Sequence, residues 1–200
     1  MVALNPINTP EEQIEIERRT TTLSKKIDAP YPLIDCDPHF SRVLRYMRGA
    51  DYAMAAGMTA LPTALILLQE RINPMNVGKR NFARILRLSF WGGLGSGFLL
   101  AYQQSSYRFY GAIENRREID MDMREMVDKV KRGEPLYGVS SLSPHNQGTM
   151  ARNSRYSAVG LYLVPWFNFV NHPYHGVDTA KYYRQAEREL EEERLKSGAS

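Results

Sequence analysis

Apolar positions in this chain are concentrated near its middle, in two segments that contain no charged residue. Tyr52–Gln69 and Leu88–Tyr107 are 18 and 20 residues long. As α-helices they would extend about 27 and about 30 Å, which matches the hydrocarbon core of a bilayer. The pattern therefore predicts two transmembrane helices that form a hairpin over residues 51–108.

Small residues recur at four-residue spacing in both segments. Ala53 and Gly57 share one helical face, as do Gly93 and Gly97. Such stripes allow helix backbones to approach closely in lipid. We expect Gly57, Gly93 and Gly97 to be packing positions, either between the two helices or against a neighbouring membrane protein. A buried helix pair in a soluble core is the alternative, but glycine would weaken such helices in water without an evident gain.

A basic connector separates the two segments. Its basic residues are Arg71, Lys79, Arg80, Arg84 and Arg87. We predict that Lys79, Arg80, Arg84 and Arg87 contact anionic lipid headgroups, with cardiolipin as a candidate, and ordinary snorkelling at a membrane edge is the alternative. The connector's charge favours the matrix or cytoplasmic side, but basic outer flanks leave the orientation open.

Polar sequence precedes the hairpin. Residues 1–30 predict an extended arm that is ordered by contact with partners. Residues 31–50 predict an interfacial segment in which Asp37 caps a short amphipathic helix. Helix entry also explains Asp35. Arg42 and the arginines that follow it lie mostly off the apolar stripe of this helix, and we place them at the membrane edge.

The sequence after the hairpin predicts further helices. Residues 109–133 begin with aromatic residues typical of a membrane interface and continue as an amphipathic helix, with a capping box at Asn115 and Glu118 and a stop at Gly133. Its apolar stripe is expected to pack against a partner subunit. Residues 134–176 predict an irregular strap that includes a short apolar segment, and residues 177–200 a charged, largely solvated helix that Asp178 caps.

These elements predict an all-α membrane protein. It would consist of a two-helix transmembrane hairpin with amphipathic helices and extended polar arms, and not of a self-contained globular domain. Charged residues make up 24% of the chain, and its net charge of +4 is spread along the sequence, which argues against nucleic acid as a partner. The glutamates of the first 19 residues do not fit a cleaved transit peptide, so we expect an uncleaved N-terminus.

Residues able to carry chemistry are few. The one cysteine, Cys36, excludes an intramolecular disulfide and a four-cysteine zinc site, and a partly buried side chain explains it. His172 and His175 have a spacing that can bind metal on a helix, but Pro173 lies between them. We therefore predict no catalytic residue, no cofactor, no metal and no small-molecule substrate. A zinc enzyme that uses these two histidines is the alternative.

Several runs of the sequence resemble a known family. YPLIDCDPHF (31–40), MDMREMVDKVKRGEPLYG (121–138), ARNSRYS (151–157), VPWFNFVNH (164–172) and HGVDTAKYY (175–183) are similar to the fungal 21-kilodalton (NUXM) accessory subunit of mitochondrial complex I. The similarity covers roughly residues 31–192. The hairpin also looks like the smaller animal accessory subunit of the C2 type, which is a looser match.

The resemblance implies a non-catalytic, two-pass accessory subunit of NADH:ubiquinone oxidoreductase in the mitochondrial inner membrane. Such a subunit would stabilise and assemble the membrane arm, with other membrane-arm subunits and inner-membrane lipids as its partners. A transport or translocase component built on a glycine-rich hairpin is the alternative function. Two spans without an ionisable residue inside them argue against a pore.

Overall fold

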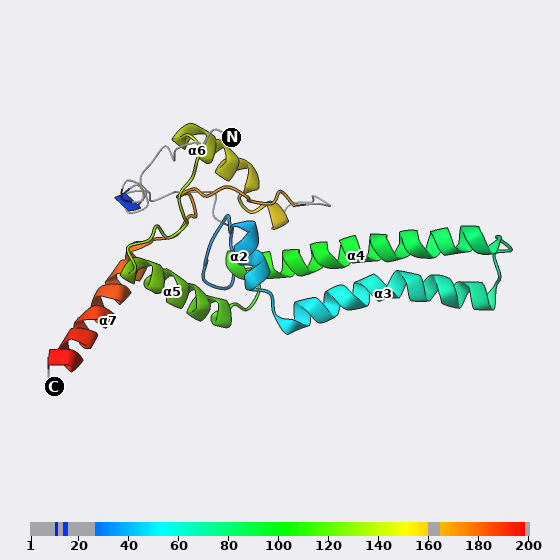
Figure 1. The fold of residues 1–200 in the computed structure, drawn as a ribbon, viewed down its shortest axis with the longest axis horizontal. Coiled ribbons are helices and arrows are strands. Elements are labelled where there is room, and N and C mark those ends of the chain that lie inside the picture. Colours follow the sequence, from blue (N-terminus) through cyan, green and yellow to red (C-terminus); the bar gives the residue numbers. More distant parts are fainter. Residues whose placement is uncertain (1–10, 12–13, 16–26, 160–164, 199–200) are drawn as a thin grey trace. The chain divides into compact units, whose positions relative to one another are not determined.

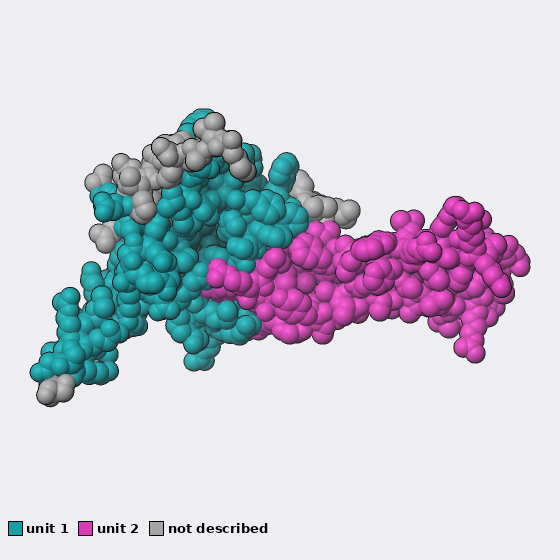
Figure 2. All heavy atoms as spheres, in the orientation of Figure 1, with its two compact units in different colours: residues 1–42, 107–200 teal, residues 43–106 magenta. Residues whose placement is uncertain are grey.

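The computed structural model describes residues 11, 14–15, 27–159 and 165–198 of the chain. Within these residues the regular structure is helical (Figure 1). The helices are α2 (Phe40–Arg45), α3 (Gly49–Ile72), α4 (Lys79–Tyr110), α5 (Arg116–Lys131), α6 (Pro144–Ser154) and α7 (Ala180–Gly198), with a 3-10 turn at Ser157–Val159. Two compact units are formed, one by residues 43–106 and the other by residues 1–42 with 107–200 (Figure 2). The prediction of an all-α chain is confirmed for the described residues.

Residues 43–106 consist largely of α3 and α4, which run antiparallel beside each other (Figure 1). Thr63 Oγ1 lies 3.5 Å from Ser89 Oγ. A Cβ atom added at Gly93 would lie 2.7 Å from the carbonyl oxygen of Thr59, and one at Gly97 would lie 2.5 Å from that of Ala55. Each turn forward along α3 thus matches one turn back along α4. Because a methyl group has no room at Gly93 or Gly97, glycine permits this backbone contact.

One helix of the described chain is long and apolar enough to cross a membrane. This is α3. Its most apolar window has a mean hydropathy of 1.4, and 6% of that window is buried against the rest of the protein. The second predicted span lies in α4, which does not meet the same criterion within the described residues. Polar Gln103 and Gln104 fall in its apolar segment, and basic residues occupy its first turns. The prediction of a membrane-length helix is therefore supported for the first segment alone.

The predicted basic connector is mostly helical. α3 continues to Ile72 and α4 starts at Lys79, so that only residues 73–78 link the two helices. Arg71 lies in the last turn of α3, and the other basic residues of the connector, Lys79, Arg80, Arg84 and Arg87, are exposed on the first turns of α4. Arg80, Arg84 and Arg87 share one helical face because they are four and three residues apart.

The other unit has an apolar core between α5 and α7. Met126, Leu136, Tyr137 and Tyr182 are buried together, with Met123 among the side chains packed on them. The prediction that the α5 stripe packs on a partner subunit is wrong for these residues, because the chain's own α7 covers it. α5 ends where predicted: Gly133 has a φ of +68°, and the N–H of Glu134 donates to the carbonyl of Lys129.

Other predicted details of this unit differ from the structure. Asn115 precedes α5, but its amide donates to the carbonyls of Pro32 and Arg108, each at 2.8 Å, in place of accepting a capping bond. Of the predicted interfacial aromatics, Phe109 and Tyr110 are buried in the described chain. Both differences have one cause: the segment that starts at residue 27 folds onto the end of α4, which the local sequence pattern does not reveal.

The sequence predicted that residues 134–157 are irregular, and this is wrong for part of them. They contain α6, which Ser143 caps by accepting from the N–H of Asn146, with Pro144 in the first turn. The predicted arm at 1–30 and much of the apolar segment around 160–164 lie outside the described residues. In the described residues that follow 160–164, Trp166 and Phe169 are 65% and 62% exposed.

Candidate functional site: a buried cluster of carboxylates, histidines and an arginine

Buried charged and titratable side chains in residues 1–42 and 107–200 form a connected cluster, to which the separate buried pair Arg108–Glu118 does not belong. Asp35 is fully buried and accepts three hydrogen bonds: from the backbone N–H of Asp37 at 2.9 Å, from Arg42 Nη1 at 3.0 Å and from His175 Nδ1 at 2.7 Å. A buried carboxylate is stable when donors satisfy its oxygens in this way. Asp35 is therefore a central acceptor of the cluster.

Arg42 joins this carboxylate to α5 and α7. Its guanidinium lies 3.0 Å from Asp35, 2.6 Å from Asp122 and 3.7 Å from Glu125. Asp122 also accepts a hydrogen bond of 2.5 Å from the hydroxyl of Tyr182, so the bond spans α5 and α7. The prediction that Arg42 lies at a membrane edge is wrong, because its side chain is 5% exposed and ion-paired.

Asp37 forms the second part of the cluster. Its Oδ2 accepts from Ser154 Oγ at 2.6 Å and lies 2.9 Å from His172 Nε2. The prediction that Asp37 caps a helix is wrong: α2 starts at Phe40, and His39 Nδ1 accepts from the N–H of Ser41 at 3.2 Å. The Asp37 side chain points to α6 and to the C-terminal segment because its donors lie there.

The hydrogen bonds define the protonation states of the two histidines. His172 Nδ1 accepts from the N–H of Tyr174 at 3.1 Å, so that Nε2 of a neutral ring donates to Asp37. Both nitrogens of His175 face acceptors, Asp35 Oδ1 at 2.7 Å and the carbonyl oxygen of His172 at 2.6 Å. An imidazole donates from both nitrogens only as a cation. The ring of Tyr137 stacks on this cation at 3.5 Å.

The electrostatics agree with this assignment. Burial favours a neutral Asp35, but the charge and hydrogen bond of His175 and the charge of Arg42 outweigh it and lower the pKa of Asp35. Burial lowers the pKa of His172 and raises that of Asp37, and their mutual hydrogen bond opposes both shifts only in part. These directions favour an ionised Asp35 and a neutral His172.

The cluster is closed to solvent and occupied by its own contacts. Apart from Glu125, whose side chain is 16% exposed, its side chains belong to residues that are at most 8% exposed. Among the described residues, no group of three or more His, Cys, Asp and Glu is arranged to hold a metal. His172 and His175, the residues of the zinc alternative, use their ring nitrogens for Asp37, Asp35 and backbone groups. The arrangement can stabilise the fold by charge pairing.

The predicted site residues lie elsewhere. Gly93 and Gly97 contact the backbone of α3, whereas a Cβ at Gly57 would meet nothing within 4 Å. The packing and lipid roles given to Gly57, Gly93, Gly97, Lys79, Arg80, Arg84 and Arg87 remain predictions. Sequence reasoning missed the cluster, although a signal was present. Asp37 and His172 each precede a proline, Asp35 and His175 lie within three residues of one, and all four are outside any apolar stripe.

These features define a class of protein: in its described residues, an all-helical chain with one membrane-length helix and a polar unit that is held by buried, paired charges. Comparison with known proteins gives the family. Residues 28–114 match the family described as NADH-ubiquinone oxidoreductase complex I, 21 kDa subunit, and residues 123–198 match the one described as the C-terminal of NADH-ubiquinone oxidoreductase 21 kDa subunit. The chain is 56% identical to the NADH-ubiquinone oxidoreductase 20.9 kDa subunit of Neurospora crassa over 181 residues, which cover 90% of this chain and 96% of that protein.

The chain therefore belongs to the family of complex I 21 kDa subunits. This membership confirms the predicted resemblance and the prediction of an accessory subunit of NADH:ubiquinone oxidoreductase in the mitochondrial inner membrane. The buried cluster joins the two matched regions. Asp35, Asp37 and Arg42 come from the first matched region, and Ser154, His172, His175 and Tyr182 from the second.

Proposed function

We propose that the chain is a non-catalytic, two-pass subunit that stabilises the membrane arm of complex I. In this proposal α3 and α4 cross the inner membrane as a hairpin, and the unit held by the buried cluster packs against neighbouring subunits outside the hydrocarbon core. The observation that carries the proposal is the exposure of α3: a helix this apolar that is 6% buried is not the core helix of a soluble domain.

The outer surface of the hairpin supports a lipid environment. Large apolar side chains of both helices are between 36% and 76% exposed: Tyr52, Leu61, Leu65, Leu67, Leu68, Ile72, Leu88, Phe90, Trp91, Leu94 and Phe98. An exposed apolar surface of this extent is unfavourable in water and marks a membrane or protein contact. Small residues and Thr63 face the partner helix, so contact between the helices rests on close packing, as in membranes.

The opposite face of α3 is suited to a neighbouring helix. Ala53, Gly57, Ala60 and Ala64 recur with helical spacing, and all four are exposed. A Cβ at Gly57 would meet open space, whereas the face with Ala55 and Thr59 contacts α4. We propose that this exposed small-residue face packs on a helix of another membrane-arm subunit.

The register of the hairpin supports contact with anionic lipids. The observed contacts pair Thr59 with Gly93 and Thr63 with Ser89. Continued along the two helices, the same register places Arg84 and Arg87 beside Leu68 and Leu65 of α3. The two apolar segments are therefore staggered, and these arginines enter the edge of the hydrocarbon layer. A guanidinium there extends its aliphatic stem and reaches phosphate groups at the interface. Cardiolipin is a suitable partner because it carries two phosphates.

Accessibility of single cysteines tests the two-pass topology. The native Cys36 is 0% exposed and should not react, so wild-type mitochondria provide the background. A hairpin requires that Asn76→Cys, in the link between α3 and α4, and Ser197→Cys, near the end of α7, lie on opposite sides of the membrane. An impermeant maleimide should label one of them in mitoplasts and the other only after the inner membrane is permeabilised. Labelling of both positions from the same side contradicts the proposal.

A further inference from the structure

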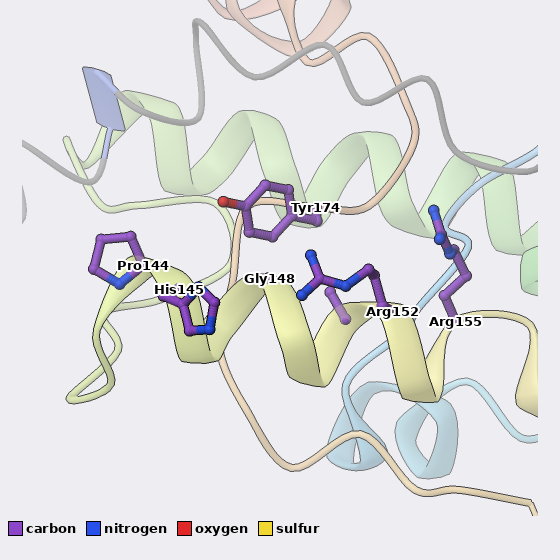
Figure 3. Close-up of a pocket in the computed structure, with 7 residues that line it drawn as sticks. Pro144, His145, Gly148, Arg152, Arg155 and Tyr174 are labelled. Carbon is purple, nitrogen blue, oxygen red and sulfur yellow. The ribbon is translucent and has the colours of Figure 1, made fainter.

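A cavity of about 500 Å³ lies against α6, in the unit that contains the buried cluster (Figure 3). His145, Gly148 and Arg152 line it from the helix, Arg155 from the position just after the helix, and the ring of Tyr174 from the C-terminal segment. The helix residues are three and four positions apart, so they share one face. Figure 3 shows the cavity beside α6, with Tyr174 facing the helix. A cavity of this size accommodates a small organic ligand.

The buried cluster fixes both walls of the cavity. Ser154 at the end of α6 donates to Asp37 at 2.6 Å. The N–H of Tyr174 donates to His172, whose ring lies 2.9 Å from the same carboxylate. The walls lie close together at Gly148, where a Cβ would be in ordinary van der Waals contact, at 3.7 Å, with the Tyr174 ring and with Arg152 Nη1. The cavity is therefore preorganised by buried contacts.

The described lining of the cavity is cationic. Its charged residues are Arg152 and Arg155, and none of the described residues that line it is an aspartate or a glutamate. Within the described part of the chain neither arginine forms an ion pair; Arg152 Nη2 donates to the neutral Thr149 hydroxyl at 3.0 Å. The Tyr174 hydroxyl has no hydrogen-bond partner among the described residues and can donate to a ligand. Two guanidinium groups and a phenol next to an apolar wall suit a phosphate attached to an organic body.

We propose that this cavity binds a phosphate-bearing organic anion, with Arg152 and Arg155 on the phosphate and Tyr174 against the organic part. The phosphate comes either from a soluble nucleotide or from a phospholipid headgroup. This inference goes beyond the proposed function, because it does not depend on α3 and α4 crossing a membrane.

The test uses the full-length chain in phosphatidylcholine nanodiscs. In one arm, calorimetric titration with adenosine diphosphate measures binding of a soluble phosphate; in the other, native mass spectrometry counts phosphatidylglycerol retained from doped nanodiscs. The variant Arg152→Gln/Arg155→Gln should bind the preferred probe at least about tenfold more weakly. Its control, Arg184→Gln/Arg188→Gln on exposed turns of α7, removes the same charge and should bind as the wild type does.

A second variant leaves the charge unchanged. Gly148→Leu places an apolar side chain in the cavity beside Tyr174 and should also abolish binding. Loss of the nucleotide alone in these variants assigns a soluble ligand, and loss of the retained lipid alone assigns a headgroup. The proposal is overturned if neither probe binds the wild type. It is equally overturned if the cavity variants bind like the α7 control while their melting curves match it.

Discussion

Asp35 and His175 lie 140 positions apart in the chain, and Oδ1 of Asp35 is 2.7 Å from Nδ1 of His175. The contact joins the proline-rich segment before α2 to the segment before α7. Because both groups are charged and buried, neither has water as an alternative partner. Folding of the N-terminal segment and of the C-terminal segment is therefore coupled.

Removal of one partner of this pair should be costly. Asp35→Asn leaves the cations Arg42 and His175 next to a neutral amide in a buried site. We expect the free energy of unfolding to fall by about 3–5 kcal/mol, the usual cost of breaking a buried ion pair. Thermal unfolding of the purified full chain measures the change. Asp178→Asn is the control, because the ion pair of Asp178 with Arg184 is exposed and should contribute about 1 kcal/mol at most. Equal stability of the two variants would contradict the central role of Asp35.

Stability should depend on pH through His172. Burial lowers the pKa of His172 below 6.5, so at weakly acid pH the unfolded chain binds a proton that the native chain does not. Its contribution to stability is thus complete above pH 6.5 and declines as the pH falls below it, by at most about 1.4 kcal/mol per pH unit. His172→Gln keeps a donor to Asp37 but has no such titration. Chemical unfolding at pH 7 and pH 5 should show a smaller loss for His172→Gln than for the wild type.

Asp37 acts in the opposite direction. Burial raises the pKa of Asp37 above 3.8, so the native chain keeps the Asp37 proton to higher pH than the unfolded chain does. The contribution of Asp37 to stability therefore declines as the pH rises through its pKa in the native chain. Asp37→Asn should therefore remove a stability change of opposite sign in the window above pH 3.8. A wild-type profile identical to that of both variants would show that these two groups do not titrate with folding.

The predictable part of this fold follows from local periodicity. The apolar runs around Tyr52–Gln69 and Leu88–Tyr107 give α3 and α4, and the stripe through Met126 gives α5, because helices of this kind show a period of 3.6 in their own sequence. Gly133 likewise reveals the end of α5, since its conformation is a local property.

The contacts of the buried cluster were not predictable, because they join distant segments. Asp37 next to Pro38 is a typical helix start, and only the arrival of Ser154 and His172 turns its carboxylate away from that role. In the same way, the charge pattern around Arg42 fits a membrane edge equally well until Asp122 is placed beside it. Buried ion pairs lack a sequence period, so local reasoning assigns their members to surfaces.

Close packing of α3 on α4 should be sensitive to position. Gly97→Leu inserts a side chain where a Cβ already lies 2.5 Å from the carbonyl oxygen of Ala55, whereas a Cβ at Gly95 meets nothing within 4 Å. We expect Gly97→Leu to reduce the amount of assembled complex I by about tenfold, as a loss of more than 1.4 kcal/mol in packing would. Gly95→Leu, the matched control two residues away, should retain most of it. Quantitative native electrophoresis of mitochondrial membranes compares the two, and equal assembly would argue against the contact.

Arg84 and Arg87 should set the lipid preference of the hairpin. In the proposed topology both guanidinium groups lie near the phosphates at one edge of the bilayer, where each cation near an anionic surface contributes about 1 kcal/mol. Arg84→Gln/Arg87→Gln should therefore weaken cardiolipin binding about thirtyfold, while Arg116→Gln/Arg117→Gln, which removes equal charge at the start of α5, should change it little. Partitioning of labelled cardiolipin onto the chain in phosphatidylcholine nanodiscs measures both variants. Two further results follow from an electrostatic contact: binding should weaken as salt increases, and Arg84→Lys/Arg87→Lys should restore most of it. An unchanged affinity in the glutamine variant would place these arginines away from the headgroups and remove the support that the staggered register gives to the two-pass proposal.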